Sequence, residues 1–201
     1  MMLAVIMSLI VGAAFGSIPF GFLAGRLNRV DIRKRGSGNI GFTNVQRTIG
    51  WAWGIPVLLL DTAKGLVPTA VAHDFGLIPP LVGTGAVLGH VFCPWLRFNG
   101  GKGVATTIGV AAFLCPRSLF ASLGVFVLIL AITGFISASS LTLAVVLPLL
   151  TAVFYKGNLA LLLFAVVVAL IIIVRHTANI RRLAAGTESH LGLWLKLFRK
   201  A

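Results

Sequence analysis

A glycine-rich stretch around one lysine, RFNGGKGVATTIG at residues 97–109, has the residue types needed to hold an anion. Glycines let the main chain approach a ligand closely, and the apolar run that follows predicts a helix whose N-terminal amides attract negative charge. The candidate phosphate-binding residues in this stretch are Gly100, Gly101, Lys102, Gly103 and Thr106. The P-loop pattern is excluded because Lys102 is followed by Gly103. A glycine-rich turn that only joins two helices is the simpler alternative.

A second polar stretch, DIRKRGSGNIGFTNVQRTIG at residues 31–50, combines glycines, amides, hydroxyls and arginines. Glycine permits close approach of the main chain, and arginine makes forked contacts to phosphate oxygens. We expect phosphate binding by Ser37, Asn39, Asn44 and Arg47. Binding to lipid headgroups is an equally good explanation for the neighbouring Arg33, Lys34 and Arg35.

The third polar stretch, RHTANIRRLAAGTE at residues 175–188, contains a histidine and an asparagine three residues apart. At this spacing His176 and Asn179 share one face of a helix and are candidates for the reacting site. A helix-end histidine at a membrane interface is an equally good explanation of His176. Glu188 is the only acid in the C-terminal quarter, and we expect it to form a structural ion pair with a nearby arginine.

Carboxylates, which two-metal and magnesium-nucleotide chemistry require, are scarce around these stretches. The chain has 4 Asp and Glu residues, of which only Asp31 and Glu188 fall within the three stretches. The residues five positions after His90 and His176 are not aspartates, so the HxxxxD arrangement of many acyltransferases is absent. A Ser-His-Asp hydrolase is not indicated either, and the cysteines lack metal-ligand spacing. We therefore expect a site of cations and amides that needs no metal and no cofactor.

The composition places these stretches in a membrane protein. Of 201 residues, 58% are hydrophobic and only 10% charged, and the mean hydropathy is +1.04. Soluble domains have about 25% charged residues. The excess of basic residues, 17 against 4 acidic ones, does not indicate a nucleic-acid partner, because these residues belong to a chain that must lie in lipid. We predict one all-α, membrane-embedded domain over residues 1–201.

Apolar runs that can cross a membrane position the polar stretches. Seven such runs cover residues 2–27, 51–72, 77–96, 104–115, 118–135, 141–155 and 159–174. The run at 104–115 is short for a span of about 20 residues and could be re-entrant. A signal peptide has its positive charges before the apolar region, whereas the first basic residues here, Arg26 and Arg29, come at the end of the first run and after it. We therefore predict a retained helix.

The distribution of positive charge predicts the orientation. With the N-terminus outside and seven crossings, one face holds Arg26, Arg29, Arg33, Lys34, Arg35, Arg47, Arg97, Lys102, Arg175, Arg181, Arg182, Lys196, Arg199 and Lys200. The opposite face keeps only Arg117 and Lys156. Because lysine and arginine accumulate on the cytoplasmic side, the three polar stretches and the C-terminus are predicted to be cytoplasmic.

Two charged residues fall inside the second run. Asp61 and Lys64 are three residues apart and can pair on one helix face, since charges within a membrane are costly and usually paired. We predict a structural role, because a lone pair gives no ion relay. His90 is expected near the cytoplasmic end of its run, where it could neighbour the site. The tail at 190–200 could form an amphipathic helix at the interface or remain a poorly ordered basic tail.

Taken together, the motifs resemble those of the PlsY family, the bacterial acyl-phosphate:glycerol-3-phosphate acyltransferases. The resemblance rests on GSGNIGFTNVQRTIG, GHVFCPWLRFNGGKGVAT and RHTANIRRLAAGTE, with GSIPFGFLAGRL and DTAKG. It runs from about residue 15 to 190 and shows no clear departure from the family pattern.

This resemblance implies the first acylation of phospholipid synthesis, in which a fatty acyl group passes from acyl phosphate to the 1-hydroxyl of glycerol 3-phosphate. The products are lysophosphatidic acid and inorganic phosphate. It also implies seven spans and an active site on the cytoplasmic face of the bacterial inner membrane. The resemblance assigns phosphate binding to Ser37, Asn39, Arg47 and Lys102. It places His176 and Asn179 at the reacting groups. The catalytic candidates are therefore His176, Asn179, Lys102 and Ser37. We expect a monomer whose partners are the two substrates and membrane lipid.

The proton acceptor remains open between two routes. His176 could take the hydroxyl proton, or a substrate phosphate oxygen could take it while His176 and Asn179 orient groups. We favour the substrate-assisted route, with Lys102 and arginine stabilising the leaving phosphate. The main alternative function is a transporter of a phosphorylated solute, which should place polar residues near the bilayer midplane. A scaffold for anionic lipids is a third option.

Overall fold

The computed structural model describes residues 1–191, and within this range every regular element is a helix. The all-helical class predicted from the sequence is therefore confirmed for the described residues. The predicted amphipathic tail lies outside the described residues from position 192 onward. The chain divides into two compact units, Met1–Leu114 and Cys115–Ala201.

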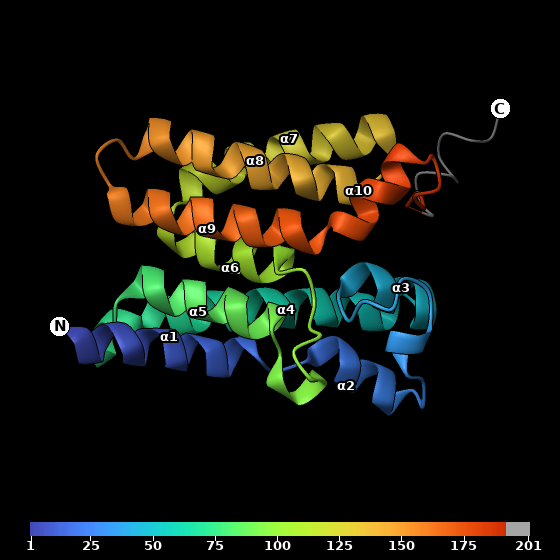
Figure 1. Ribbon diagram of the computed structural model, residues 1–201, viewed down its shortest axis with the longest axis horizontal. Helices are drawn as coiled ribbons and strands as arrows, with labels where there is room; N and C mark the ends of the chain where they lie inside the picture. Colours follow the sequence, from blue (N-terminus) through green and yellow to red (C-terminus); the bar gives the residue numbers. More distant parts are fainter. Residues whose placement is uncertain (192–201) are drawn as a thin grey trace. The chain divides into compact units, whose positions relative to one another are not determined.

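The first unit contains six α-helices (Figure 1) and three short segments of 3-10 helix. Its elements are α1 (Met2–Gly16), α2 (Phe20–Leu27), η1 (Ile32–Lys34), α3 (Phe42–Ile49), α4 (Trp51–Val71), η2 (Ala72–Phe75), α5 (Pro79–Val91), η3 (Pro94–Leu96) and α6 (Val104–Leu114). The polar stretch at 31–50 thus contains η1 and α3, and the glycine-rich loop at 97–103 joins η3 to α6.

Glycines allow the helices that flank the glycine-rich loop to pack closely on their neighbours. A Cβ on Gly89 of α5 would overlap the main chain of Ala13 in α1. On α6, a Cβ at Gly109 would overlap the carbonyl of Thr62 in α4. Small residues at helix contacts are the usual way for membrane helices to approach each other. Both helices that carry the loop are therefore fixed on long partners, α5 on α1 and α6 on α4.

A small hydrophobic cluster joins the stretch at 31–50 to the segment before the glycine-rich loop. Ile32, Ile40 and Val45 from the first stretch are buried in it together with Cys93 and Leu96 from η3 and its flank. Burying such aliphatic side chains stabilises each by about 1.5–3 kcal/mol relative to exposure. The two polar stretches of this unit are thus held on a common core.

The described part of the second unit, up to residue 191, has four helices, α7 (Pro116–Thr133), α8 (Ile136–Phe154), α9 (Leu159–Arg175) and α10 (Thr177–Ala184). Helix α8 packs on both α7 and α9, and short α10 contacts α8 and α9 (Figure 1). Between α9 and α10 the chain bends by 57° at a single residue, His176. This bend sets the third polar stretch apart from the apolar run that precedes it.

In the part of the chain that the structure describes, four helical segments are long and apolar enough to cross a membrane: Met2–Leu27, Trp51–Phe75, Pro116–Thr133 and Ile136–Phe154. A fifth is obtained if α9 and α10 form one bent span. The first is broken at Ser17–Pro19 rather than continuous, since proline cannot donate a main-chain hydrogen bond. Helix α6 has 11 residues, in line with its short run.

The predicted run at 77–96 differs most from the structure. Its helix, α5, has only 13 residues and ends at Val91. The sequence then turns through Cys93 into η3, whose first residue is Pro94. Arg97 and Phe98 follow with positive φ, which a continuing helix does not allow. The hydropathy of this segment therefore overstated the length of its helix.

Candidate functional site

The glycine-rich loop is tied by its main chain to the last turn of α5. The Gly100 amide donates to the Val91 carbonyl at 3.0 Å, and the Gly101 amide donates to the His90 carbonyl at 3.1 Å. These bonds use carbonyls that the helix end leaves without intrahelical partners. The loop is therefore a C-terminal extension of α5 in a defined conformation, and Lys102 follows its second anchored residue.

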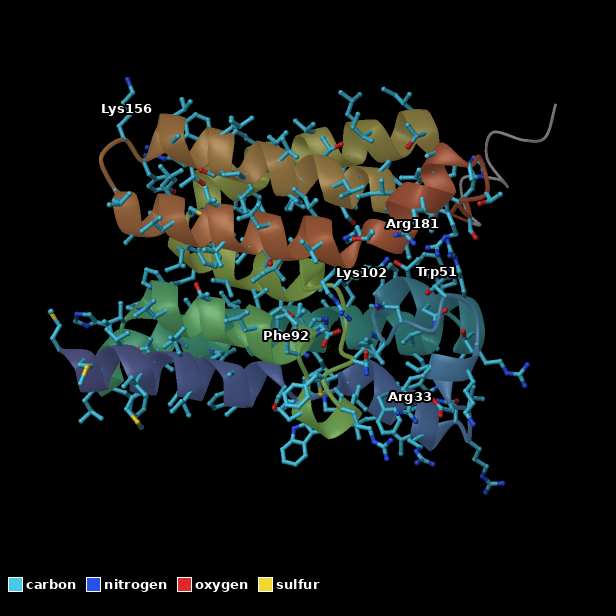
Figure 2. All side chains as sticks on the ribbon, viewed as in Figure 1. Arg33, Trp51, Phe92, Lys102, Lys156 and Arg181 are labelled. Atoms are coloured by element: carbon cyan, nitrogen blue, oxygen red, sulfur yellow. The ribbon has the colours of Figure 1, made fainter. Side chains whose placement is uncertain are left out.

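Beyond these anchors the loop turns into α6. Gly103 has φ +87°, a conformation that favours glycine, and its carbonyl accepts a hydrogen bond from the Thr107 amide at 2.8 Å. Lys102 is half-buried on the extended segment that leads into α6 (Figure 2). A positive charge thus lies one residue before the turn that opens the helix, as expected for a site that holds an anion.

The two threonines of the first turn of α6 are fully buried. The hydroxyl oxygens of Thr106 and Thr107 have no hydrogen-bond partner among the described residues. Thr106 packs toward α4, because a Cβ on Gly65 would overlap its carbonyl and approach its methyl group at 3.1 Å. Buried hydroxyls without partners are uncommon and call for an explanation such as a ligand.

A buried ion pair lies under this part of the unit. Lys64 Nζ is 2.7 Å from Asp61 Oδ1 and also donates to the Ile18 carbonyl at 2.7 Å. The two charged side chains are 2% and 3% exposed, so the pair is shielded from solvent. Nδ1 of the buried His90 lies 3.7 Å from the same carboxylate oxygen. The predicted pair therefore exists, and it links α4 to the break between α1 and α2.

In the stretch at 31–50, Asn44 organises the loop before α3. Its side-chain amide donates to the carbonyls of Ile32, Arg35 and Asn39 at 2.8–3.1 Å, and its oxygen accepts from the Ser37 amide at 2.9 Å. Asn44 is 2% exposed. These bonds favour a positioning role for Asn44 over the direct phosphate contact that the sequence suggested.

The remaining candidates of this stretch, Ser37, Asn39 and Arg47, lie on or next to the loop that the hydrogen bonds of Asn44 hold in place. Ser37 is exposed between two glycines with positive φ, Gly36 and Gly38. The half-buried Asn39 accepts from the Gly41 amide at 2.9 Å and so forms the turn that starts α3. Arg47 is exposed in the last turn of α3. The loop therefore presents a hydroxyl and a guanidinium on a fixed frame.

Arg33 of this loop is held by a carboxylate and an aromatic ring of the protein. Its guanidinium makes two hydrogen bonds of 2.9 Å to Asp31 and lies over the ring of Phe22 at 4.8 Å. The hydrogen bonds from Arg33 lower the pKa of Asp31 to about 2. Arg33 is thus held by a protein carboxylate on the solvent side of the loop.

His176 occupies the bend between α9 and α10 and is 2% exposed. Its Nδ1 lies 2.8 Å from the Ile172 carbonyl. Because a carbonyl can only accept, Nδ1 carries a hydrogen, and in the neutral form of the ring the lone pair is on Nε2. The bend therefore fixes both the direction of the ring and the nitrogen that can take up a proton.

Glu188 gathers three side chains onto its carboxylate. One oxygen accepts from Asn179 at 2.7 Å and from Ser137 at 3.0 Å, and the other accepts from Arg182 Nε at 2.6 Å. The expected ion pair with an arginine is present. The same carboxylate ties α10 to the start of α8 through its bond from Ser137. The hydrogen bond from Asn179 also fixes the amide orientation of that side chain, one turn after His176.

The carboxylate of Glu188 is kept ionised by these partners. Burial alone would raise its pKa, but the hydrogen bonds from Arg182, Asn179 and Ser137 outweigh burial and lower the pKa below the ordinary glutamate value. A charged carboxylate accepts stronger hydrogen bonds than a neutral one. The polar end of this unit is thus assembled around one negative charge.

Comparison with known proteins identifies the family. A profile described as Glycerol-3-phosphate acyltransferase matches residues 6–186 of the chain. The chain belongs to the glycerol-3-phosphate acyltransferase family. Similar members are those of Trichlorobacter lovleyi, 46% identical over 87% of this chain and 91% of the relative, and Geobacter sulfurreducens, 48% identical over the same shares.

Solved structures in the family give the same result. The chain resembles PlsY, an integral membrane glycerol 3-phosphate acyltransferase, in its glycerol 3-phosphate form, with a TM-score of 0.87, 35% identity and 98% of both chains covered. The lysophosphatidic acid form gives a TM-score of 0.85 at 35% identity, over 94% of this chain and 95% of that one. Together with the apolar helices, this shows that the chain is a multi-pass integral membrane protein.

Two residues that contact the polar stretches, Ser137 and His90, were not predicted from the sequence to bind them directly. Ser137 contacts Glu188 across 51 positions of sequence, and no motif signals such a pairing. His90 was expected only as a neighbour, yet its carbonyl anchors Gly101 directly. Its position four residues before Pro94, at a helix end, is the one signal that could have indicated this role.

Among the described residues, no three His, Cys, Asp or Glu side chains are grouped so that they could hold a metal ion. Three of the four carboxylates pair with cations, Asp31 with Arg33, Asp61 with Lys64, and Glu188 with Arg182. The acidic groups near the polar stretches therefore serve to place basic groups.

Proposed function

We propose that the chain transfers a fatty acyl group from acyl phosphate to the 1-hydroxyl of glycerol 3-phosphate. The products would be lysophosphatidic acid and inorganic phosphate. The observation that carries the proposal is the anchored glycine-rich loop around Lys102 in a member of this family. The substrate and product named for the two forms of the similar solved protein support the same reaction.

In this reaction the glycerol hydroxyl oxygen bonds to the acyl carbon, and the bond from that carbon to the phosphate oxygen breaks. The hydroxyl proton is lost and the released phosphate can carry it, so no external acid or reductant is needed. Acyl phosphates have a good leaving group, so strong activation of the hydroxyl is less necessary. The main task of the protein is then to bind two phosphate groups and to stabilise the charge on the departing one.

We assign that task to cations and main-chain amides of the first unit. Lys102 would stabilise the leaving phosphate, and Ser37, Asn39 and Arg47 would bind phosphate oxygens. The loop glycines give the main chain close access. Thr106 would offer its buried hydroxyl, whereas Asn44 would act by holding the loop that carries Ser37.

For the second unit we propose that His176 and Asn179 serve the reacting groups. The lone pair on Nε2 makes His176 chemically able to accept the hydroxyl proton. The alternative is that a substrate phosphate oxygen accepts it while the fixed imidazole and amide orient the substrate. We favour the second route, because both side chains are held by neighbours in defined orientations.

A His176→Ala variant separates the two routes. If the substrate-assisted route holds, kcat falls and the affinity for glycerol 3-phosphate falls with it. Isothermal titration of the purified variant with glycerol 3-phosphate measures that affinity independently of turnover. Loss of turnover with unchanged affinity would instead identify His176 as the base.

The donor is tested by kinetics with purified protein. We expect radiolabelled glycerol 3-phosphate to be converted to lysophosphatidic acid when palmitoyl phosphate is supplied, in the presence of a chelator. Acyl-CoA and acyl-carrier protein are the comparison donors. No lipid product with palmitoyl phosphate would refute the proposed reaction, and restoration of activity only by a divalent ion would refute the proposed independence from metal.

The location of the site follows from the charge distribution. We infer seven crossings of the bacterial inner membrane by a single-domain monomer, with the N-terminus outside and the C-terminus and active site cytoplasmic. Cysteines introduced at Ser37 and Arg181 should react with membrane-impermeant thiol reagents only after the cells are opened. One introduced at Lys156 should react in intact cells. The two positions of the second unit, Lys156 and Arg181, lie at opposite ends of its helices (Figure 2).

A further inference from the structure

The imidazole of His90 lies between a buried carboxylate and the glycine-rich loop. Its Nδ1 is 3.7 Å from Asp61 Oδ1, and the opposite edge of the ring faces Gly101. The same residue also holds Gly101 through its carbonyl, which accepts the Gly101 amide at 3.1 Å. His90 therefore contacts the loop with both its side chain and its main chain, directly beside Lys102.

Contact with the ring explains why position 101 is glycine. A Cβ added there would overlap His90 Nε2 and lie 2.7 Å from Cε1 and 3.0 Å from Cδ2. All three nearest atoms belong to the imidazole. Gly101 does not have a positive φ, so its backbone conformation alone would accept alanine. The requirement for glycine at this position thus comes from one side chain.

The preceding glycine is constrained in a different way. A Cβ on Gly100 would overlap the main-chain carbonyl of His90 and lie 2.7 Å from that of Val91. These oxygens belong to the last turn of α5 and remain in place whatever side chain is present. The two adjacent glycines therefore form a matched pair, one limited by a side chain and the other by backbone.

We propose that His90 is a positioning residue that sets the place of Lys102 through Gly101. The buried carboxylate of Asp61 lies on the far side of the ring, 3.7 Å from Nδ1, and Lys64 holds that carboxylate. The proposal rests on the proposed function, in which this loop binds substrate phosphate. A displacement of about 1 Å at such a site can lower the rate by about 10²-fold.

A double-mutant cycle between His90→Ala and Gly101→Ala tests this coupling. Gly101→Ala alone should raise KM for glycerol 3-phosphate or for palmitoyl phosphate by about tenfold or more, since the loop must move away from the ring. In the His90→Ala background the added methyl group occupies space that the ring has left. The double variant should therefore have a lower KM than Gly101→Ala, although His90→Ala alone raises it.

Gly100→Ala is the matched control. It should also raise KM, but His90→Ala should give it no relief, because the overlapping atoms are main-chain oxygens. Thermal unfolding in detergent checks that each variant is folded. If His90→Ala yields no folded protein, His90→Asn replaces it in the cycle, since asparagine also lacks the Nε2 and Cε1 atoms.

The outcomes separate this inference from the function on which it rests. Equal KM increases from Gly101→Ala with and without His90 would overturn the positioning role and leave the acyltransferase proposal intact. Unchanged KM in both glycine variants of an active enzyme would instead remove the loop from the phosphate site, and with it the inference. Relief specific to position 101 is the result that supports it.

Discussion

The glycine-rich loop at 97–103 and the segment at 176–188 are both proposed to serve the reaction, but they are built by opposite means. The loop packs closely because glycines at 100 and 101 have no side chain. The main-chain amides of these glycines donate to the carbonyls of Val91 and His90. The segment is shaped by side chains that are present, three of which converge on Glu188.

This difference predicts how each region fails. The loop should be damaged by added atoms, because a Cβ at Gly100 or Gly101 meets protein atoms at once. The segment should be damaged by removed atoms, because loss of one partner leaves other buried polar groups unsatisfied. Charge matters in both, since the loop carries a cation that we propose binds substrate phosphate, and the segment carries a carboxylate that binds protein groups.

The largest effect is expected from Lys102, the cation among the glycines of the loop. Lys102→Ala should lower kcat/KM by about 10²–10³-fold, the usual cost of removing one group that stabilises transition-state charge. Steady-state kinetics with palmitoyl phosphate and glycerol 3-phosphate measure it. Lys102→Arg is the matched control, and we expect it to keep part of the activity because it keeps the charge. A tenfold or smaller loss in Lys102→Ala would place the main anion contact elsewhere.

The buried pair of Asp61 and Lys64 tests whether the unit that carries the loop also depends on a carboxylate for its stability. Asp61→Asn leaves Lys64 without its counter-charge and should lower the free energy of unfolding by about 3–5 kcal/mol. Thermal unfolding in detergent reports the loss. Replacing both, Asp61→Leu with Lys64→Met, should recover most of it, since an apolar pair has no unpaired charge. A double variant as unstable as Asp61→Asn would contradict this account.

Much of the helical framework could be predicted from hydropathy, because a membrane span needs a long apolar run. Each of the seven predicted runs contains a helix, among them α4 at Trp51–Val71 and α9 at Leu159–Arg175. What hydropathy could not predict is where an apolar segment stops being helical. The break at Ser17–Pro19 and the early end of α5 at Val91 depend on proline and local backbone conformation, and the residues around them remain apolar.

Site residues were predictable where their interaction is local. The ion pair between Asp61 and Lys64 could be predicted from their helical spacing, and the ion pair of Glu188 from the arginines nearby in the sequence. Long-range contacts gave no such signal. The bonds of Asn44 to main-chain groups 5 to 12 positions away favour a role in organising the loop over direct phosphate binding. Such contacts depend on the tertiary fold, which spacing alone does not determine.

The segment at 176–188 should respond to Glu188→Gln, which removes a charge with little change in shape. We expect the free energy of unfolding to fall by about 1–2 kcal/mol, a value reduced because Arg182 is partly exposed. Activity should fall as well, since Asn179 loses its charged acceptor. Thermal unfolding and kcat measure the two effects. Full stability in this variant would show that the neutral amide serves Asn179, Ser137 and Arg182 equally well.

The pH dependence of stability sharpens the same test. The pKa of Glu188 is lower in the folded protein than its ordinary value, so its contribution is fully present above the ordinary value. It is lost as the pH falls through the lowered pKa of the folded state. The difference in melting temperature between wild type and Glu188→Gln should therefore be constant near neutral pH and vanish in strong acid. A difference that grows on acidification would have the wrong sign.

The smallest effect is expected where an ion pair faces solvent. Asp31 pairs with Arg33, but both side chains are substantially exposed, and exposed pairs contribute little. Asparagine can also keep the hydrogen bond from the Arg33 amide that starts η1. Asp31→Asn should therefore leave melting temperature and both KM values unchanged within about twofold. A lower KM for glycerol 3-phosphate in this variant would contradict the prediction. It would mean that Asp31 restrains Arg33, and that the released arginine binds phosphate. The stretch at 31–50 would then depend on charge as much as the glycine-rich loop does.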